Sequence, residues 1–157
     1  MTKSVISAKK LNILCVVLML ALTVCQFVPF WSMDGQTASI SGYIWFPEDH
    51  TDFTAQFEQT PGNEDFKVVN LVVYNAVIML GGLASAVLCI WKPNSVWPGA
   101  LGVLCGLAGT VGYASKPVFH LGAGWQFHLI LSIFVLLAAA GNLLYQFKLQ
   151  SKSHASS

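Results

Sequence analysis

The sequence predicts an all-α membrane protein, a bundle of four transmembrane helices with a β-hairpin and a short helix in a loop outside the membrane. Of its 157 residues 55% are apolar and 10% charged, against about 25% charged residues in ordinary soluble domains. The apolar residues form long runs, whereas all seven acidic residues lie between positions 34 and 65. A chain of this composition needs lipid around most of its surface. Its length fits a single membrane domain, residues 1–157.

The first apolar run, residues 11–30, predicts an uncleaved transmembrane helix. Lys3, Lys9 and Lys10 precede it, so a signal peptide is the alternative. The run is about 20 residues long, which is the length of a membrane span and exceeds the apolar core of a signal peptide. No small-x-small cleavage site follows it, because the run ends in bulky residues.

Residues 31–67 form the predicted outer loop, which has a pattern of its own. Asp34-Gly35 signals a two-residue hairpin because both residues tolerate positive φ. Residues 37–46 then alternate between two faces, one of which is apolar, and this period of two is typical of a strand. The partner strand would be residues 30–33. A proline ends the long strand, and a short helix is expected after it.

Three further apolar runs predict the remaining spans, over residues 68–91, 96–114 and 118–147. The breaks between them each contain a lysine followed by a proline, which disfavours a continuous helix. The polar tail, residues 148–157, is expected to be disordered because it has little to bury.

The lysines predict the orientation of the chain. Four spans place most of them on one side: Lys3, Lys9, Lys10, Lys92, Lys148 and Lys152. Only Lys67 and Lys116 fall on the other side. The positive-inside rule then puts both termini in the cytoplasm and residues 31–67 outside the cytoplasmic (plasma) membrane. The chain has no arginine and no basic cluster of the kind that binds nucleic acid.

Small residues in the helices predict close helix packing. The third span carries Gly99, Gly102, Gly106 and Gly109, which fall within a stripe about 80° wide at 100° per residue. Gly81 and Ser85 repeat the small-xxx-small spacing in the second span. Such stripes let helices approach closely in lipid. Either the stripe packs within one bundle, or it binds another chain.

Polar residues at membrane depth are costly and therefore mark candidate functional sites. His128 is expected inside the fourth span, with His120 at its outer boundary. Asn75 or Asn70, at a similar outer depth in the second span, could form a hydrogen bond to a histidine. The alternative is a structural histidine. No Asp, Glu or Lys lies within a helix interior, which disfavours a proton relay or a cation path.

The acidic cluster of the loop does not have the spacing of a metal site. It consists of Glu48, Asp49, His50 and Asp52. The segment has neither the calcium-loop glycine nor zinc-ligand spacing, and carboxylates are also favoured at a helix N-terminus. The sequence therefore predicts neither a metal nor a cofactor. A membrane enzyme that uses a metal at this cluster or at His120 is the weakest of the function hypotheses.

Motifs for nucleophilic or phosphate chemistry are also missing. The sequence has no G-x-S-x-G, no H-E-x-x-H and no phosphate-binding loop. The four cysteines lie in apolar runs without a CxxC spacing, which is typical of buried thiols: Cys15, Cys25, Cys89 and Cys105.

The layout resembles that of the claudin-like tetraspan proteins, with a long first outer loop containing Trp31 and Trp45 and a short second one. The resemblance implies a small sheet seated on the helices. The loop lacks the Gly-Leu-Trp motif and paired cysteines of claudins, so no functional residue is carried over. The segment Gly-Tyr-Ile-Trp-Phe-Pro at residues 42–47 is also similar to small, uncharacterised four-helix membrane proteins of bacteria, which implies no activity.

The sequence favours a non-enzymatic accessory or scaffold protein. It would recognise a membrane-protein partner, or associate with itself, through residues 31–67 and the glycine-rich helix faces. Aromatic residues concentrate binding energy, and the candidates are Trp31, Tyr43, Trp45, Phe53 and Phe57. Their alternative role is to cover the outer ends of the helices. The second hypothesis is a subunit of a small oligomeric transporter or channel, with His128, Asn75 and the glycine stripe along its path.

Overall fold

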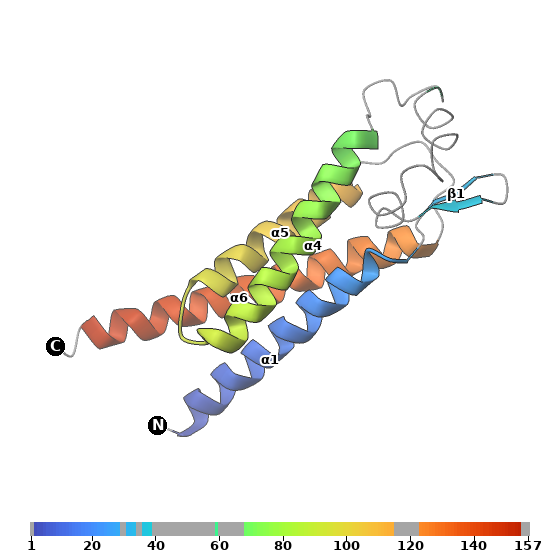
Figure 1. The fold of residues 1–157 in the computed structure, drawn as a ribbon. Helices are drawn as coiled ribbons and strands as arrows, with labels where there is room; N and C mark the ends of the chain where they lie inside the picture. The colour runs from blue at the N-terminus through green and yellow to red at the C-terminus, as the bar shows by residue number, and fades with distance from the viewer. Residues whose placement is uncertain are drawn as a thin grey trace.

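The computed structural model describes residues 2–28, 31–33, 36–38, 59, 68–114 and 123–154. This part of the chain contains four helices: α1 (Thr2–Cys25), α4 (Val68–Trp91), α5 (Trp97–Ala114) and α6 (Ala123–His154). They run alternately up and down, so the start of α1, the α4–α5 turn and the end of α6 lie at one end of the bundle (Figure 1). The predicted all-α fold with four helices is confirmed for the described residues.

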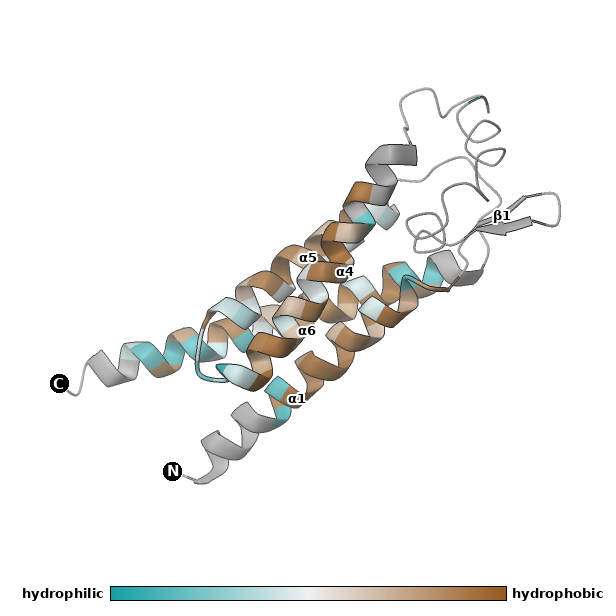
Figure 2. Ribbon diagram, viewed as in Figure 1, coloured by the Kyte–Doolittle hydropathy of each residue, from teal (hydrophilic) through white to brown (hydrophobic). Residues whose placement is uncertain are grey.

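Each helix packs against two neighbours, in the order α1, α4, α5, α6 and back to α1. The α5–α6 pair has the most extensive contact. Figure 2 shows hydrophobic residues along the middle of the bundle and hydrophilic residues near the α4–α5 turn and in the C-terminal part of α6.

One stretch of the described chain, Gln126–Ser151 in α6, is long and apolar enough to cross a membrane. The apolar stretches Lys10–Cys25 in α1 and Asn75–Trp91 in α4 are shorter. Length and composition thus identify one candidate span, and the four-span topology stays a prediction.

The first helix is displaced towards the N-terminus relative to the prediction of residues 11–30. α1 already includes the polar residues from Thr2 onwards, because they can continue a helix beyond an apolar segment. It ends at Cys25, and the amides of residues 26–28 donate to carbonyls three residues back. This tightened last turn precedes Pro29, and the residue before a proline avoids the helical conformation.

The last helix also differs from the prediction. α6 begins at Ala123, close to Gly124, where the helix of the fourth run was expected to start, and residues 118–122 of that run lie outside the described residues. The helix continues to His154, beyond the predicted end at residue 147. The prediction of a disordered tail is therefore wrong for residues 148–154. This segment has no proline or glycine and contains Lys, Leu and Gln, which are good helix formers, so the helix continues after the apolar residues end.

Two short strands follow α1. β1 (Trp31–Met33) pairs antiparallel with β2 (Gln36–Ala38), and Met33 lies opposite Gln36. This is the pairing predicted from Asp34-Gly35. The predicted continuation of the second strand to residue 46 and the short helix after it lie outside the described residues.

The glycines predicted as a stripe are buried on α5: Gly99, Gly102, Gly106 and Gly109. A Cβ on Gly106 would lie 2.6 Å from the backbone nitrogen of Leu136 in α6. A Cβ on Gly99 would lie 3.0 Å from the backbone nitrogen of Leu143, also in α6. The stripe therefore faces α6, and here the two backbones approach too closely to admit side chains on α5.

Two adjacent glycines of α4 face different neighbours. A Cβ on Gly81 would lie 2.5 Å from Cys105 Sγ of α5, and one on Gly82 would lie 3.2 Å from Thr23 Oγ1 of α1. Gly82 was missed in the sequence because the small-xxx-small spacing selects one helix face, whereas α4 packs on two sides.

Substitution of Gly106 tests the α5–α6 contact. We expect Gly106→Ala to lower the free energy of unfolding by about 1–3 kcal/mol, because the added methyl group would displace the backbone of α6. Gly141→Ala is the matched control, since a Cβ there meets no atom within 4 Å. Unfolding of the purified variants in a detergent series measures both effects. Equal losses of stability for the two variants would contradict the inward-facing stripe.

Candidate functional site

Polar side chains are buried inside the bundle and gather at its two ends. The buried polar residues of the described chain are Gln26, Asn75, Ser85, His128, Ser132, Asn142 and Gln146. Four side chains near β1 and β2, from α4, α5, α6 and the turn that follows α1, form what we call the loop-side cluster: Gln26, Asn75, Tyr113 and His128. Side chains of α1 and α6 near the α4–α5 turn, together with the Pro93 carbonyl, form the turn-side cluster: Asn12, Asn142, Gln146 and Pro93.

Tyr113 of α5 is the centre of the loop-side cluster. Its hydroxyl lies 3.1 Å from Oε1 of Gln26, in the turn that follows α1, and 2.5 Å from Asn75 Oδ1 of α4. The hydroxyl has one proton and therefore donates to one amide oxygen at a time. Gln26 is itself held, because its Nε2 donates to the Leu22 carbonyl at 3.1 Å. One phenol group thus joins α4, α5 and the turn that follows α1 through buried polar contacts.

The fourth helix enters this cluster through His128. Its side chain is fully buried, and its ring centroid lies 5.1 Å from that of Tyr113 with the rings tilted by 55°. Ser132 follows one helical turn later on the same face of α6 and is also fully buried. Within the described part of the chain the Ser132 hydroxyl has no hydrogen-bond partner. The polar surface therefore continues from the cluster towards the middle of the bundle.

Ser85 of α4 forms a further buried polar contact, with the start of α5. Ser85 Oγ donates to the Pro98 carbonyl in the first turn of α5 at 2.7 Å. This bond holds the end of α4 and the start of α5 together close to their turn.

The turn-side cluster holds the α4–α5 turn against α1 and α6. The Pro93 carbonyl accepts hydrogen bonds from Asn12 Nδ2 at 3.0 Å and from Gln146 Nε2 at 2.9 Å. Asn142 Nδ2 in turn donates to Asn12 Oδ1 at 2.7 Å. Three amide side chains thus bind one another and one backbone carbonyl. These contacts fix the α4–α5 turn between α1 and α6.

Two of the polar residues predicted from the sequence come together. Asn75 and His128 both contact Tyr113, which lies between them. Trp31 lies in β1. The other predicted aromatic and polar candidates lie outside the described residues: Tyr43, Trp45, Phe53, Phe57 and His120.

Sequence reasoning missed most of the turn-side cluster and the centre of the loop-side cluster: Tyr113, Gln26, Asn12, Asn142 and Gln146. An available signal was the spacing of Asn142 and Gln146, which places two amides on one face of a helix. Tyr113 had no such signal, because tyrosine is common at the end of a membrane helix without a buried partner.

The chemistry available in the described residues is neutral hydrogen bonding. They contain no group of three or more His, Cys, Asp or Glu that could hold a metal ion. The cysteines are free thiols, and Asn142 Nδ2 lies 3.7 Å from Cys15 Sγ. Both clusters therefore connect helices.

Comparison with known proteins provides no relative, because no family model, no curated protein and no solved structure matches the chain.

A double-mutant cycle tests whether Tyr113 joins the helices. We expect Tyr113→Phe and Asn75→Leu to be coupled by about 0.5–1.5 kcal/mol in the free energy of unfolding, because each removes the same buried hydrogen bond. Tyr113→Phe and Asn142→Leu should be additive within about 0.5 kcal/mol, since the two clusters lie at opposite ends of the bundle. Denaturation of the purified variants measures both values. Additivity in the first pair would contradict the contact.

Proposed function

We propose that this chain is an integral membrane protein with four spans, and that it serves as a non-enzymatic accessory or scaffold protein. In this proposal the bundle is a rigid anchor, and residues 31–67 recognise a membrane-protein partner. The observation that carries the membrane part is an inversion of polarity, since amide, hydroxyl and imidazole groups are inside while large apolar side chains are outside.

The outward face of α4 illustrates the inversion. Val73, Leu80 and Ile90 are 60%, 62% and 70% exposed, over almost the full length of the helix. Other outward residues of the helix are also aliphatic, namely Val77, Leu83 and Val87. Soluble monomers rarely expose continuous apolar surfaces of this kind. Lipid is therefore the solvent that suits this surface, and buried polar groups then find partners inside the bundle.

Helix lengths support four spans. At about 1.5 Å per residue, the 24 residues of α1 and of α4 extend over about 36 Å and the 18 of α5 over about 27 Å. The hydrocarbon core is about 30 Å thick. The glycine stripe of α5 faces α6. The outward side chains of α5 include the apolar residues Leu104, Leu107 and Val111, which are exposed.

The distribution of charge supports cytoplasmic termini. Lys10, Lys92 and Lys148 are exposed at the end of the bundle that contains the α4–α5 turn. All acidic residues belong to the segment that connects α1 and α4 at the other end. The lysine-rich side is cytoplasmic by the positive-inside rule.

The interior favours an anchor over a pore. In the described chain no Asp, Glu, Lys or Arg is buried, and the polar groups of both clusters bind one another. The glycine stripe is occupied by α6, so partner recognition is assigned to residues 31–67. There the aromatic candidates Tyr43, Trp45, Phe53 and Phe57 stand among carboxylates, and aromatic residues concentrate binding energy at interfaces.

A second candidate, a subunit of a small transporter or channel, is favoured by one observation. The loop-side cluster takes a polar residue from each of α4, α5 and α6 and from the turn that follows α1, and Ser132 extends it inward. Polar residues at membrane depth mark solute pathways in many transporters.

Cysteine labelling tests the topology. We expect a membrane-impermeant maleimide to label Gln59→Cys in sealed right-side-out vesicles, because Gln59 is exposed in the outer loop. Lys92→Cys, at the opposite end, should react only after permeabilisation. Parallel labelling of the unsubstituted protein controls for the native thiols. Reaction of both positions before permeabilisation, or of Lys92→Cys alone, would contradict the proposed topology.

The mass of the complex extracted from its native membrane in mild detergent tests the scaffold. We expect a second protein in a fixed ratio, lost in Trp45→Ala because the indole is a contact residue, while insertion is unchanged. Trp91→Ala is the control, since Trp91 is exposed at the opposite end. A lone protomer would contradict the scaffold. Flux through liposomes that His128→Ala alters would support the second candidate instead.

A further inference from the structure

We propose that the end of the bundle with the α4–α5 turn binds the headgroups of anionic phospholipids through Lys10, Lys92 and Lys148. This inference rests on the proposed insertion of the bundle in a membrane, and it adds a ligand of defined chemistry at the end opposite to residues 31–67.

The turn-side cluster brings these lysines to one level, although they lie far apart in the sequence. Each is within two residues of a residue bound at the Pro93 carbonyl: Lys10 beside Asn12, Lys92 beside Pro93 itself and Lys148 beside Gln146. Two residues of helix correspond to about 3 Å along the axis. Lys10 precedes Asn12 near the start of α1, and Lys148 follows Gln146 near the end of α6. The three lysines are therefore anchored near the same plane at this end of the bundle.

The lysines also point away from the bundle. Two residues correspond to about 200° around a helix, so Lys10 and Lys148 lie on the face opposite to the amides that bind Pro93. All three side chains are exposed. They form a basic rim around the turn. Among the residues that the structure describes, no Asp or Glu is present to neutralise it, because every acidic residue lies between positions 34 and 65.

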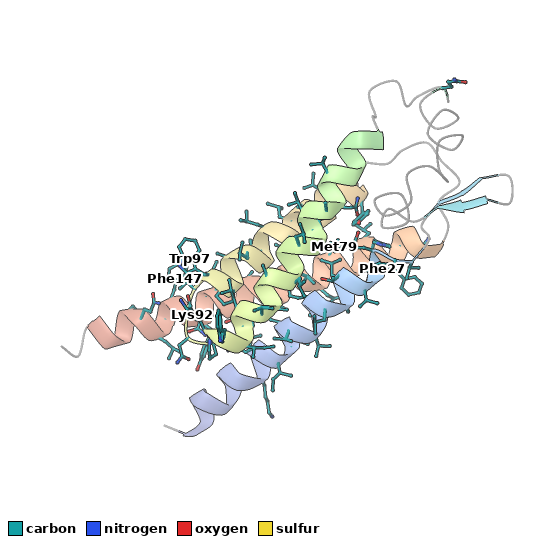
Figure 3. All side chains as sticks on the ribbon, viewed as in Figure 1. Phe27, Met79, Lys92, Trp97 and Phe147 are labelled. Atoms are coloured by element: carbon teal, nitrogen blue, oxygen red, sulfur yellow. The ribbon has the colours of Figure 1, made fainter. Side chains whose placement is uncertain are left out.

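Aromatic residues place this rim at the lipid headgroups. Trp91 and Trp97 stand on either side of the turn and are 80% and 67% exposed. Tryptophan side chains prefer the level of the headgroups, between the hydrocarbon and water. Figure 3 shows Trp97, Phe147 and Lys92 at the same end of the bundle. The rings and the methylene stems of the lysines contact acyl chains, while the ammonium groups reach the phosphates.

The charge of the rim fits an anionic phospholipid better than a zwitterionic one. Lysine ammonium groups bind phosphate as point charges. A phosphatidylcholine headgroup carries its own cation, whereas phosphatidylglycerol leaves the phosphate charge unbalanced. Each lysine near an anionic surface strengthens binding roughly fivefold, so three should give on the order of a hundredfold.

Lipid titration of the full chain in neutral detergent tests the site. Mixed micelles with phosphatidylglycerol or phosphatidylcholine are added, and bound lipid is measured by native mass spectrometry and by tryptophan fluorescence. We expect tighter binding of phosphatidylglycerol, weakened on the order of a hundredfold in K10Q/K92Q/K148Q. K10R/K92R/K148R keeps the charge and should bind like the wild type. Circular dichroism checks that both variants remain helical.

The wild type alone provides a second measurement. Raising the salt from about 0.05 M to about 0.5 M should weaken binding of phosphatidylglycerol, because salt screens exposed charges. Equal affinity for both lipids, insensitivity to salt, or unchanged binding in the glutamine variant would overturn the inference. Displacement of the lipid by millimolar inorganic phosphate would also overturn it, in favour of a soluble anion.

Membrane extraction separates this inference from the proposed function. Wild-type protein released from membranes by alkaline carbonate would overturn both the insertion and the lipid site. Protein that resists carbonate but binds both lipids equally would overturn the lipid site alone.

Discussion

The close approach of α5 to α6 is the constraint on which much of this bundle depends. At Gly106 the two backbones are so near that a Cβ would lie 2.6 Å from Leu136 N. The same approach lets the Tyr113 ring of α5 reach the His128 ring of α6. It also places Gly109 against the Ser132 side chain. The glycines of α5 thus bring the polar face of α6 into the interior, where the other helices complete it.

The two polar clusters make the bundle specific without charged groups. Apolar side chains provide little discrimination between helices in lipid, because lipid tails are equally apolar. The Tyr113 hydroxyl joins α4, α5 and the turn that follows α1 at one end. The Pro93 carbonyl joins the α4–α5 turn to α1 and α6 at the other. Each end therefore has a contact that only the correct arrangement of helices can form. This fits a rigid anchor for a recognition loop.

In the proposed membrane arrangement, the turn-side cluster also positions the charged groups that would face the lipid headgroups. By holding the turn between α1 and α6, the amides place three lysines from distant parts of the sequence at one level. Residues 31–67 carry all the acidic groups and leave from the opposite end. The bundle thus separates a basic end from an acidic one, and the apolar faces of its helices lie between them.

Composition and periodicity predicted the four helices, because long apolar runs separated by short polar breaks are typical of helices in a bundle. Asp34-Gly35 predicted the β1–β2 pairing, because both residues tolerate positive φ. Helix ends were predicted less well. α6 continues to His154 because helix-forming polar residues extend a helix after the apolar signal stops.

The candidate site was predicted only in part. Asn75 and His128 stood out as polar residues in apolar runs, but Tyr113, which joins them, did not. Nor could the spacing of the glycines show which helix they face. Sequence spacing defines the face of one helix, whereas a cluster depends on the rotation of four helices about their axes. Only the packed bundle fixes these rotations, because backbone contact at the glycines and buried hydrogen bonds must form together.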